Sequence, residues 1–207
     1  MLIDFTNFLT EHKMKVTGIL HVGAHRAQEQ GAYKEEVQPH NIFWIEALGH
    51  VVEELKQQDP QLNIFQAVID EEEKEVEFNV ANNEESSSLL NFGTHRQSHP
   101  NVEHVETIKT RTTRVDTVIK EKQLPIENIN FLNTDIQGND LACIKSLGEY
   151  IKHIDYIYTG IYTGNVYDGN PLVGEVDEFL ESKGFSRVET EITPWEWGDA
   201  LYIRSKQ

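Results

Sequence analysis

Apolar runs alternate with amphipathic stretches along the first third of the chain. The predicted strands are Gly18–Val22, Asn41–Ile45 and Leu62–Val68, and the predicted helices between them run from about Arg26 to Val37 and from Leu48 to Gln58. Strands that are apolar on both faces and alternate with helices are typical of a parallel sheet with helices on both faces. The pattern therefore predicts an α/β fold.

The middle of the chain departs from this rhythm. Glu75–Val80 alternates polar and apolar residues like a half-exposed strand, and Val105–Val115 predicts a strand that leads into a helix at Asp116–Lys122. Between the two strands lies a polar segment, about residues 81–104. Because long polar loops in compact units often carry function, we expect this segment to lie on the substrate side of a site.

The last third returns to strands and helices. The predicted elements are strands at Ile129–Thr134 and Ile154–Tyr162, helices at Asp140–Tyr150 and Leu172–Lys183, and closing strands at Phe185–Glu191 and Ala200–Ile203. Two successive strands at the end predict an antiparallel edge. With an amphipathic N-terminal helix at about residues 3–13, we expect one domain over residues 1–207.

Composition and charge exclude several classes of partner. The net charge of −17 repels phosphate backbones, so we expect no nucleic-acid or anionic-membrane partner. No run approaches the roughly 18 apolar residues of a spanning helix, and the start does not resemble a signal peptide, which together predict a cytoplasmic protein. Cys143 lies in an apolar helical pattern and is interpreted as a core residue. The oligomeric state stays open.

The first candidate site is the turn after the first strand, HVGAHRAQEQGAY at residues 21–33. Its small residues let a ligand approach the backbone, and the next helix presents free N–H groups. The turn lacks the G-x-G-x-x-G spacing of a dinucleotide site and suits a ligand without phosphates, such as S-adenosylmethionine. A structural turn without a ligand is an equally good interpretation of this motif alone.

Two acidic residues follow predicted strands at the same edge of the sheet. Glu46 stands where a carboxylate accepts hydrogen bonds from both ribose hydroxyls of a nucleoside, although it could instead serve the start of the next helix. Asp135, in FLNTDIQGNDL, could bind the methionine amino group, act as a general base or hold a metal. The structural alternative for Asp135 is a helix cap.

The polar segment carries a further set of candidates, Asn82, Asn83, three serines and two histidines. His95 and His99 lie four positions apart, which on a helix would place both imidazoles on one face. No H-E-x-x-H pattern accompanies them, so we expect substrate contact here and no metal site.

Taken together, these segments resemble the FkbM-type methyltransferase family, in particular a branch whose first motif reads HVGAH. The resemblance extends from about Gly18 to Arg204 and includes HVGAH (21–25), WIEAL (44–48), NNEESSSLLNFGTH (82–95), RVDT (114–117), FLNTDIQGNDL (131–141), VYDGNPLVGEVDEFL (166–180) and WGDALYIR (197–204).

The resemblance implies a class I methyltransferase, Rossmann-like fold: a mostly parallel seven-stranded sheet with an antiparallel last strand. It implies transfer of a methyl group from S-adenosylmethionine to a hydroxyl of a sugar, glycan or small metabolite. By position, the cofactor residues would be Gly23, Ala24, His25, Glu46, Ala47, Ala67, Val68 and Asp135; the catalytic residues Asp135 and, second, His95; and the substrate residues Ser87, Ser88, His99 and Tyr162.

One segment departs from the family pattern. Where this branch commonly has Tyr-Thr-Glu-Val-Asn-Thr-Glu, the chain reads YTGIYTG, with Gly160, Tyr162 and Gly164 in place of an acid, an amide and an acid. The alternative function is therefore an S-adenosylmethionine-binding module that has lost turnover. A nicotinamide dehydrogenase is disfavoured by the missing G-x-G-x-x-G and by the antiparallel ending.

Overall fold

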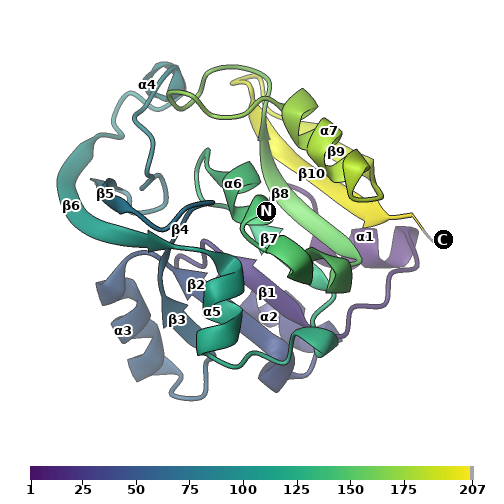
Figure 1. Ribbon diagram of the computed structural model, residues 1–207. Helices are drawn as coiled ribbons and strands as arrows, with labels where there is room; N and C mark the ends of the chain where they lie inside the picture. The colour runs from purple at the N-terminus through teal and green to yellow at the C-terminus, as the bar shows by residue number, and fades with distance from the viewer. Residues whose placement is uncertain (206–207) are drawn as a thin grey trace.

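The centre of the molecule is a seven-stranded sheet with the order β3-β2-β1-β7-β8-β10-β9 (Figure 1). The computed structural model describes residues 1–205. The strands of this sheet are β1 (Ile19–Val22), β2 (Ile42–Glu46), β3 (Ile64–Gln66), β7 (Phe131–Thr134), β8 (Tyr156–Tyr162), β9 (Phe185–Ile192) and β10 (Trp197–Arg204). Only β10 runs against its neighbours, and all other pairs are parallel. The predicted mixed sheet with an antiparallel last strand is confirmed.

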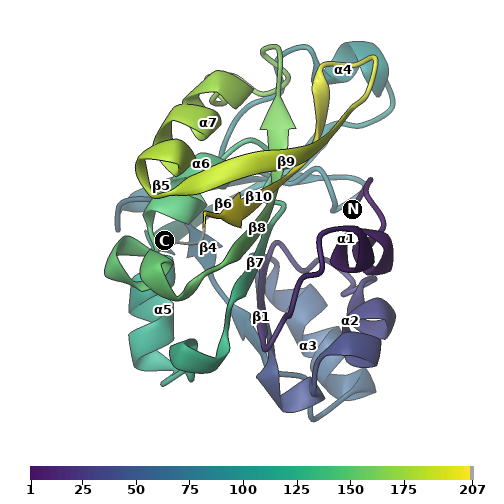
Figure 2. The same cartoon turned by 90° about the vertical axis from the view of Figure 1, so that its right-hand side faces the viewer.

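Helices cover both faces of this sheet, as predicted (Figure 2). One face carries α1 (Phe5–Glu11), α2 (Gln30–Glu36) and α3 (Gly49–Gln58), and the other carries α5 (Val115–Glu121), α6 (Asp140–Lys145) and α7 (Val173–Ser182). Short 3₁₀ helices lie at Pro39–Asn41, Ile126–Asn128 and Gly148–His153. Cys143 belongs to α6 and is fully buried in the core, in agreement with its interpretation as a core residue.

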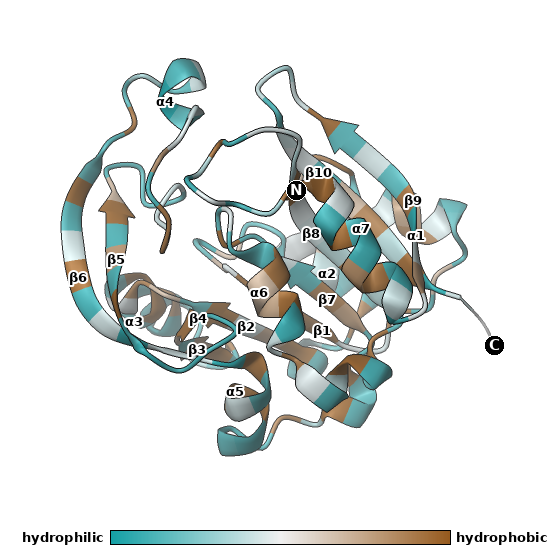
Figure 3. Ribbon diagram, turned by 45° about the horizontal axis from the view of Figure 1, so that its top comes forward, coloured by the Kyte–Doolittle hydropathy of each residue, from teal (hydrophilic) through white to brown (hydrophobic). Residues whose placement is uncertain are grey.

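Most helices carry hydrophobic and hydrophilic residues together, whereas the strands at the centre of the sheet are largely apolar (Figure 3). This contrast follows from burial, because a covering helix hides one side and a central strand hides both. No helix in the part of the chain that the structure describes has the length and apolar character needed to cross a membrane.

A second, three-stranded sheet lies beside the main one and has the order β4-β6-β5. Its strands are β4 (Val68–Ile69), β5 (Glu75–Ala81) and β6 (His104–Thr113), and the short helix α4 (His95–Ser98) follows β5. The prediction of a single strand at Leu62–Val68 is therefore wrong, because this segment is divided between β3 and β4. The chain leaves the main sheet at Ala67, whose N–H donates to Glu46 O at 2.9 Å, and then pairs with β6.

Two predicted helices are shorter than the pattern suggested. The helix expected from Arg26 begins only at Gln30, because His25 (φ 40°) and Ala27 (φ 52°) have left-handed backbone that a right-handed helix excludes. The helix expected over Asp140–Tyr150 ends at Lys145 and is followed by the 3₁₀ segment that begins at Gly148 (φ 54°). The remaining boundaries differ by a few residues at most.

Candidate functional site

A cavity of about 540 Å³ opens at the edge where the parallel strands of the main sheet end. Its walls come from the turn after β1, the ends of β2 and β8, the residues after β7, the beginning of β10 and the segment after β5. A volume of ~300–1,000 Å³ is typical of small-molecule sites. Because β10 runs in the opposite direction, its first residues reach the edge at which the parallel strands end.

Gly23 lies in the turn after β1 and lines this cavity. Its φ is 90°, and a Cβ at this position would lie 1.9 Å from the carbonyl oxygen of Asp135. The N–H groups of Gly23 and Ala24 both donate to Ile45 O, at 2.9 and 3.0 Å. The turn therefore requires glycine, and it joins the ends of three strands with a backbone that a ligand can approach.

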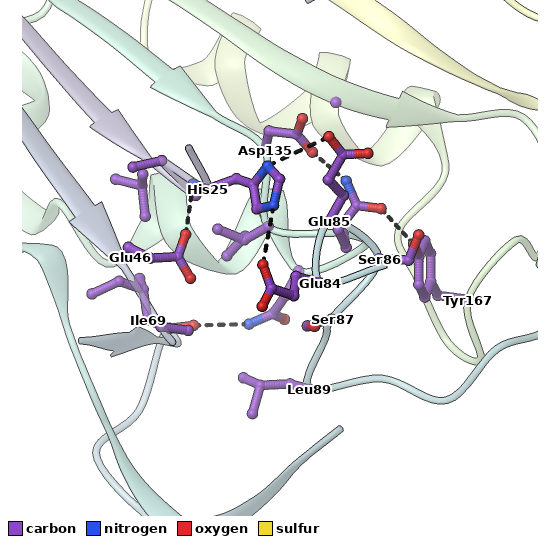
Figure 4. A pocket seen from close by; sticks show the side chains of 18 of the residues that line it. His25, Glu46, Ile69, Glu84, Glu85, Ser86, Ser87, Leu89, Asp135 and Tyr167 are labelled. Carbon is purple, nitrogen blue, oxygen red and sulfur yellow. Dashed lines mark hydrogen bonds and ion pairs between the residues drawn. The ribbon is translucent and has the colours of Figure 1, made fainter. Parts of the chain in front are cut away.

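Glu46 is almost completely buried and connects two turns at the cavity wall. Oε2 accepts the His25 N–H at 2.7 Å (Figure 4). Oε1 accepts the Leu48 N–H at 2.8 Å where α3 begins. The local helix-start role that the sequence left open is therefore present. Each oxygen keeps a second lone pair for a ligand, so this role and ribose binding are compatible.

The carboxylate of Glu84 connects the segment after β5 to the turn after β1 and to α3. Its carboxylate pairs with Arg26 Nη2 and with His50 Nε2, both at 2.7 Å. His25 Nε2 lies 3.7 Å from Glu84 Oε2, and His25 Nδ1 lies 3.4 Å from Glu85 Oε1. Figure 4 shows the imidazole between the two carboxylates. The hydrogen bond from His50, then the pairing with Arg26, lowers the pKa of the Glu84 carboxyl. These contacts hold the polar segment across the cavity.

Asp135 follows β7 and points into the cavity, where protein atoms surround its carboxylate on several sides but leave it accessible from the cavity. It accepts one side-chain hydrogen bond, from Gln137 Nε2. Burial, followed by the nearby charge of Asp199, raises the pKa of Asp135 to about 6. A carboxyl that titrates near neutrality is suited to proton transfer.

The helix-cap role considered for Asp135 is absent, because the N-cap residue of α6 is Asn139 and no side chain of the described chain caps this helix. Asp140, the first residue of α6, instead holds the turn that precedes the helix. Asp140 accepts the N–H groups of Ile136 at 3.0 Å and Gly138 at 3.3 Å, and it is 2% exposed. Burial and the charge of Asp135 raise the pKa of Asp140 to about 7. Asp135 accepts no backbone N–H among the described residues, which leaves its carboxylate available to a ligand.

His95 and His99 lie side by side, as their spacing predicted. His95 begins α4 and His99 follows its last residue, with ring centroids 4.9 Å apart, and both line the cavity. The other face of His95 stacks on Phe92 at 4.3 Å. Burial, followed by the charges of His99 and His104, lowers the pKa of His95 to about 4. The imidazole is therefore neutral near pH 7.

Comparison with known proteins places this architecture in a family. A family model described as the methyltransferase FkbM domain matches residues 21–187, most of the chain. The chain belongs to this family. It is an S-adenosylmethionine-dependent methyltransferase, in agreement with the resemblance inferred from the motifs. A comparison with curated proteins found no match.

Solved structures share the fold of this methyltransferase at low sequence identity. A protein from Sulfolobus solfataricus assigned to the type 11 methyltransferases is 12% identical, with a TM-score of 0.52 over 100% of this chain and 95% of the other. An uncharacterized protein from Listeria monocytogenes is 8% identical, with a TM-score of 0.52 over 100% and 70% of the two chains. The likeness supports the class I methyltransferase fold.

The methyltransferase brings nearly all of its sequence-predicted site residues to one cavity. Those that line it are Gly23, Ala24, His25, Glu46, Ala47, Ala67, Val68, Ser87, His95, His99, Asp135 and Tyr162. Ser88 differs: it is 1% exposed, its hydroxyl donates to Gln137 O at 2.7 Å, and it does not line the cavity. Its hydroxyl connects the polar segment to the turn after β7, so a substrate cannot reach it directly.

Sequence reasoning missed several lining residues, most importantly Asp199. Asp199 belongs to WGDALYIR and lies near the start of β10, opposite Gly160 of β8. The sequence could have indicated Asp199, because the first residues of an antiparallel closing strand lie at the edge where the parallel strands end. The strand was instead expected to begin only at Ala200, which left Asp199 in a turn. The side chains of Gln137 and Tyr167 were missed as well.

Proposed function

We propose that this methyltransferase acts on a hydroxyl oxygen of a sugar, a glycan or a small metabolite. The observation that carries the proposal is Asp135, a carboxylate in the cavity whose pKa is raised to about 6 and which is free of any helix-capping role. Methyl transfer to a hydroxyl requires a group that takes up the hydroxyl proton as the oxygen attacks. Asp135 supplies such a group at neutral pH.

The cofactor half of the cavity fits S-adenosylmethionine. The glycine-only turn at Gly23 leaves backbone open to a ligand, and Glu46 presents lone pairs at the ribose position. Ala47, Ala67 and Val68 offer an apolar wall for the adenine. The turn after β7 would then face the methionine end, with Asp135 between cofactor and acceptor.

When bound, S-adenosylmethionine supplies an electrophilic methyl group on a sulfonium. The residues of the chain have to align the acceptor hydroxyl with that methyl and exclude water from the cavity. Asp135 accepts the hydroxyl proton at its carboxylate. Gln137, which donates to Asp135 and accepts from the Tyr167 hydroxyl, fixes the orientation of that carboxylate.

His95 is the weaker of the two bases named from sequence. Its pKa of about 4 lies below the value of about 6 for Asp135, so the imidazole holds a proton less readily. His95 and His99, at the two ends of α4, instead lie together in the cavity wall formed by the segment after β5. We assign them to acceptor contact, together with Ser87 and Tyr162.

The competing function is a binding module that holds the cofactor without turnover. Gly160 favours this alternative because it leaves the end of β8 without an acidic side chain. Tyr162 favours it as well, because burial raises the pKa of its hydroxyl well above the usual value and the hydroxyl stays protonated. Asp135 and Asp199 nevertheless provide carboxylates in the same region.

A methyl-transfer assay against neutral sugars, with cofactor affinity measured in parallel, tests the proposal. We expect turnover on at least one sugar and a loss of ~100-fold or more in Asp135→Asn, the usual contribution of a general base. The affinity for S-adenosylhomocysteine should fall much less. Tight cofactor binding without product on any acceptor would favour the binding module, and a wild-type rate in Asp135→Asn would remove Asp135 as the base.

A further inference from the structure

Asp199 lies directly across from Gly160 in the antiparallel pair of β10 and β8. Cross-strand neighbours project to the same face of a sheet, so the Asp199 side chain lies beside the space that a side chain at position 160 would fill. Both residues line the cavity. A Cβ at Gly160 would lie 3.4 Å from the nearest atom, Asp140 Oδ2, which is an ordinary van der Waals contact, so the strand could hold a methyl group here.

One oxygen of Asp199 is held by the protein and the other is free. Oδ2 accepts the Leu2 N–H at 2.6 Å and the hydroxyl of Tyr158. Tyr158 is itself buried, and its hydroxyl accepts the Ile3 N–H at 3.0 Å. Oδ1 has no hydrogen-bond partner within residues 1–205. The carboxylate is thus fixed in orientation and still has an acceptor group available for a ligand.

The surroundings of Asp199 combine aromatic surface with negative charge. Tyr162, Tyr167 and Trp197 line the cavity near it, and flat aromatic surface suits the apolar face of a sugar ring. The carboxylates that line the cavity are Glu29, Glu46, Glu84, Glu85, Asp135 and Asp199. No lysine or arginine lines the cavity within residues 1–205. The basic groups that do line it are the amino group of Met1, which pairs with Glu29, and the imidazoles of His21, His25, His95 and His99. The fixed charges of the cavity wall are therefore mostly negative, which disfavours an acceptor phosphate or carboxylate.

We infer that Asp199 is an acceptor-binding residue, which accepts a hydrogen bond from a sugar hydroxyl lying over Gly160 and selects neutral acceptors over anionic ones. This inference rests on the proposed function and names the substrate class of the same site. Asp135 takes up the proton of the reacting hydroxyl, and Asp199 holds a neighbouring hydroxyl. Both carboxylates line the same cavity, and the charge of Asp199 contributes to the raised pKa of Asp135.

The test compares neutral sugars with their acidic counterparts. The protein is saturated with S-adenosylhomocysteine, and dissociation constants are measured for the methyl glycosides of glucose, galactose and mannose and for the matching methyl uronides. We expect wild type to bind at least one neutral glycoside about tenfold more tightly than its uronide, because a second negative charge near Asp199 is repelled. In Asp199→Asn, which keeps an acceptor oxygen, this preference should fall to about threefold or less.

Glu191→Gln is the matched control. Glu191 lies opposite Asp199 on β9, is exposed and does not line the cavity, so this variant removes one charge from the same row of the sheet and should keep the wild-type preference. Gly160→Ala is the second variant, since its methyl has room in the fold but occupies the acceptor space. It should weaken neutral-glycoside binding about fivefold or more at unchanged S-adenosylhomocysteine affinity.

The outcomes separate this inference from the proposed function. A wild-type protein that fails to bind S-adenosylhomocysteine would contradict the proposed function itself. Normal cofactor binding without affinity for any neutral glycoside, or with uronides bound as tightly, would overturn the acceptor class. An unchanged preference in Asp199→Asn, with folding verified by circular dichroism, would overturn the role of Asp199. Should Asp199→Asn not fold, full glycoside affinity in Gly160→Ala would overturn it.

Discussion

Individual residues at the cavity combine a structural bond with an available functional group. Glu46 accepts two backbone N–H groups and keeps lone pairs for a ligand, and Asp199 uses one oxygen for Tyr158 and leaves the other free. Fixing a carboxylate in this way removes rotational freedom before a ligand arrives, which reduces the entropy cost of binding. Gly23 acts differently, because its lack of a side chain allows β1 and β7 to meet.

Substitution of Glu46 tests its ribose role. Glu46→Gln should weaken S-adenosylhomocysteine binding by ~1–3 kcal/mol, because a charge-assisted hydrogen bond is lost. The measurement is titration calorimetry. Glu53→Gln, at an exposed acid of α3 that does not line the cavity, is the control and should bind like wild type. Equal affinity in Glu46→Gln and wild type would remove Glu46 from the cofactor site.

At the scale of elements, the segment after β5 lines one side of the cavity, and Glu84 is one of the residues that attach it to the rest of the domain. Glu84 joins it to Arg26 and His50, which belong to the turn before α2 and to α3. Within the segment, the Ser87 N–H donates to Glu84 O at 3.0 Å. Partly exposed ion pairs stabilise by only ~0.2–1 kcal/mol each, so we expect their loss to loosen the part of the segment around Glu84 without unfolding the domain.

Loss of the Glu84 charge should make this opening more frequent. In Glu84→Gln we expect hydrogen exchange at the amides of residues 84–88 to accelerate by ~2–10-fold, with unchanged exchange in the strands of the main sheet. Glu85→Gln is the control, since that side chain is more exposed and makes longer contacts. Equal acceleration in both variants would show that Glu84 has no special fastening role.

At the scale of the whole molecule, the core contains polar groups whose ionisation is coupled to folding. His21 is 3% exposed, stacks on Trp44 at 4.8 Å and lies 3.2 Å from the Tyr33 hydroxyl. Burial, partly offset by the charge of Glu29, lowers the pKa of His21 to about 4. Between about pH 6.5 and pH 4, the His21 imidazole binds a proton in the unfolded chain but not in the folded protein. The contribution of His21 to the free energy of unfolding is therefore fully present above about pH 6.5 and is lost as the pH falls toward 4.

The contribution of His21 is measurable as a change in the pH dependence of unfolding. Between pH 7 and pH 5 the loss assigned to His21 is about 2 kcal/mol, and His21→Gln should lack it. Urea unfolding of both proteins at the two pH values measures the difference. The raised pKa of Asp140 acts in the opposite direction, since stability falls as the pH rises from about 4 to about 7, but both proteins share it.

His40→Gln is the control for this experiment, because His40 is exposed. It should show the wild-type pH dependence. If His21→Gln and wild type lost the same free energy of unfolding between pH 7 and pH 5, the buried neutral imidazole would not account for acid sensitivity.

The sequence by itself determined the order of elements and the residues that follow the parallel strands. Apolar runs identify central strands because both faces must be buried, and parallel strands place their ends at one edge. Gly23, Glu46 and Asp135 could therefore be assigned to one site without a structure, and the shared motifs indicated the family that the comparison then showed. The left-handed turns before α2 and the division of β3 from β4 were not visible in the hydrophobic pattern.

Only the tertiary structure decided which distant residues share the cavity. Asp199 faces Gly160 because β10 lies between β8 and β9, an order that depends on the packing of the whole sheet. The same packing determines the charge environment, since burial and neighbouring groups raise the pKa of Asp135 and lower that of His95. Both effects act between residues far apart in the chain, and a local pattern of residue types carries no information about such distances.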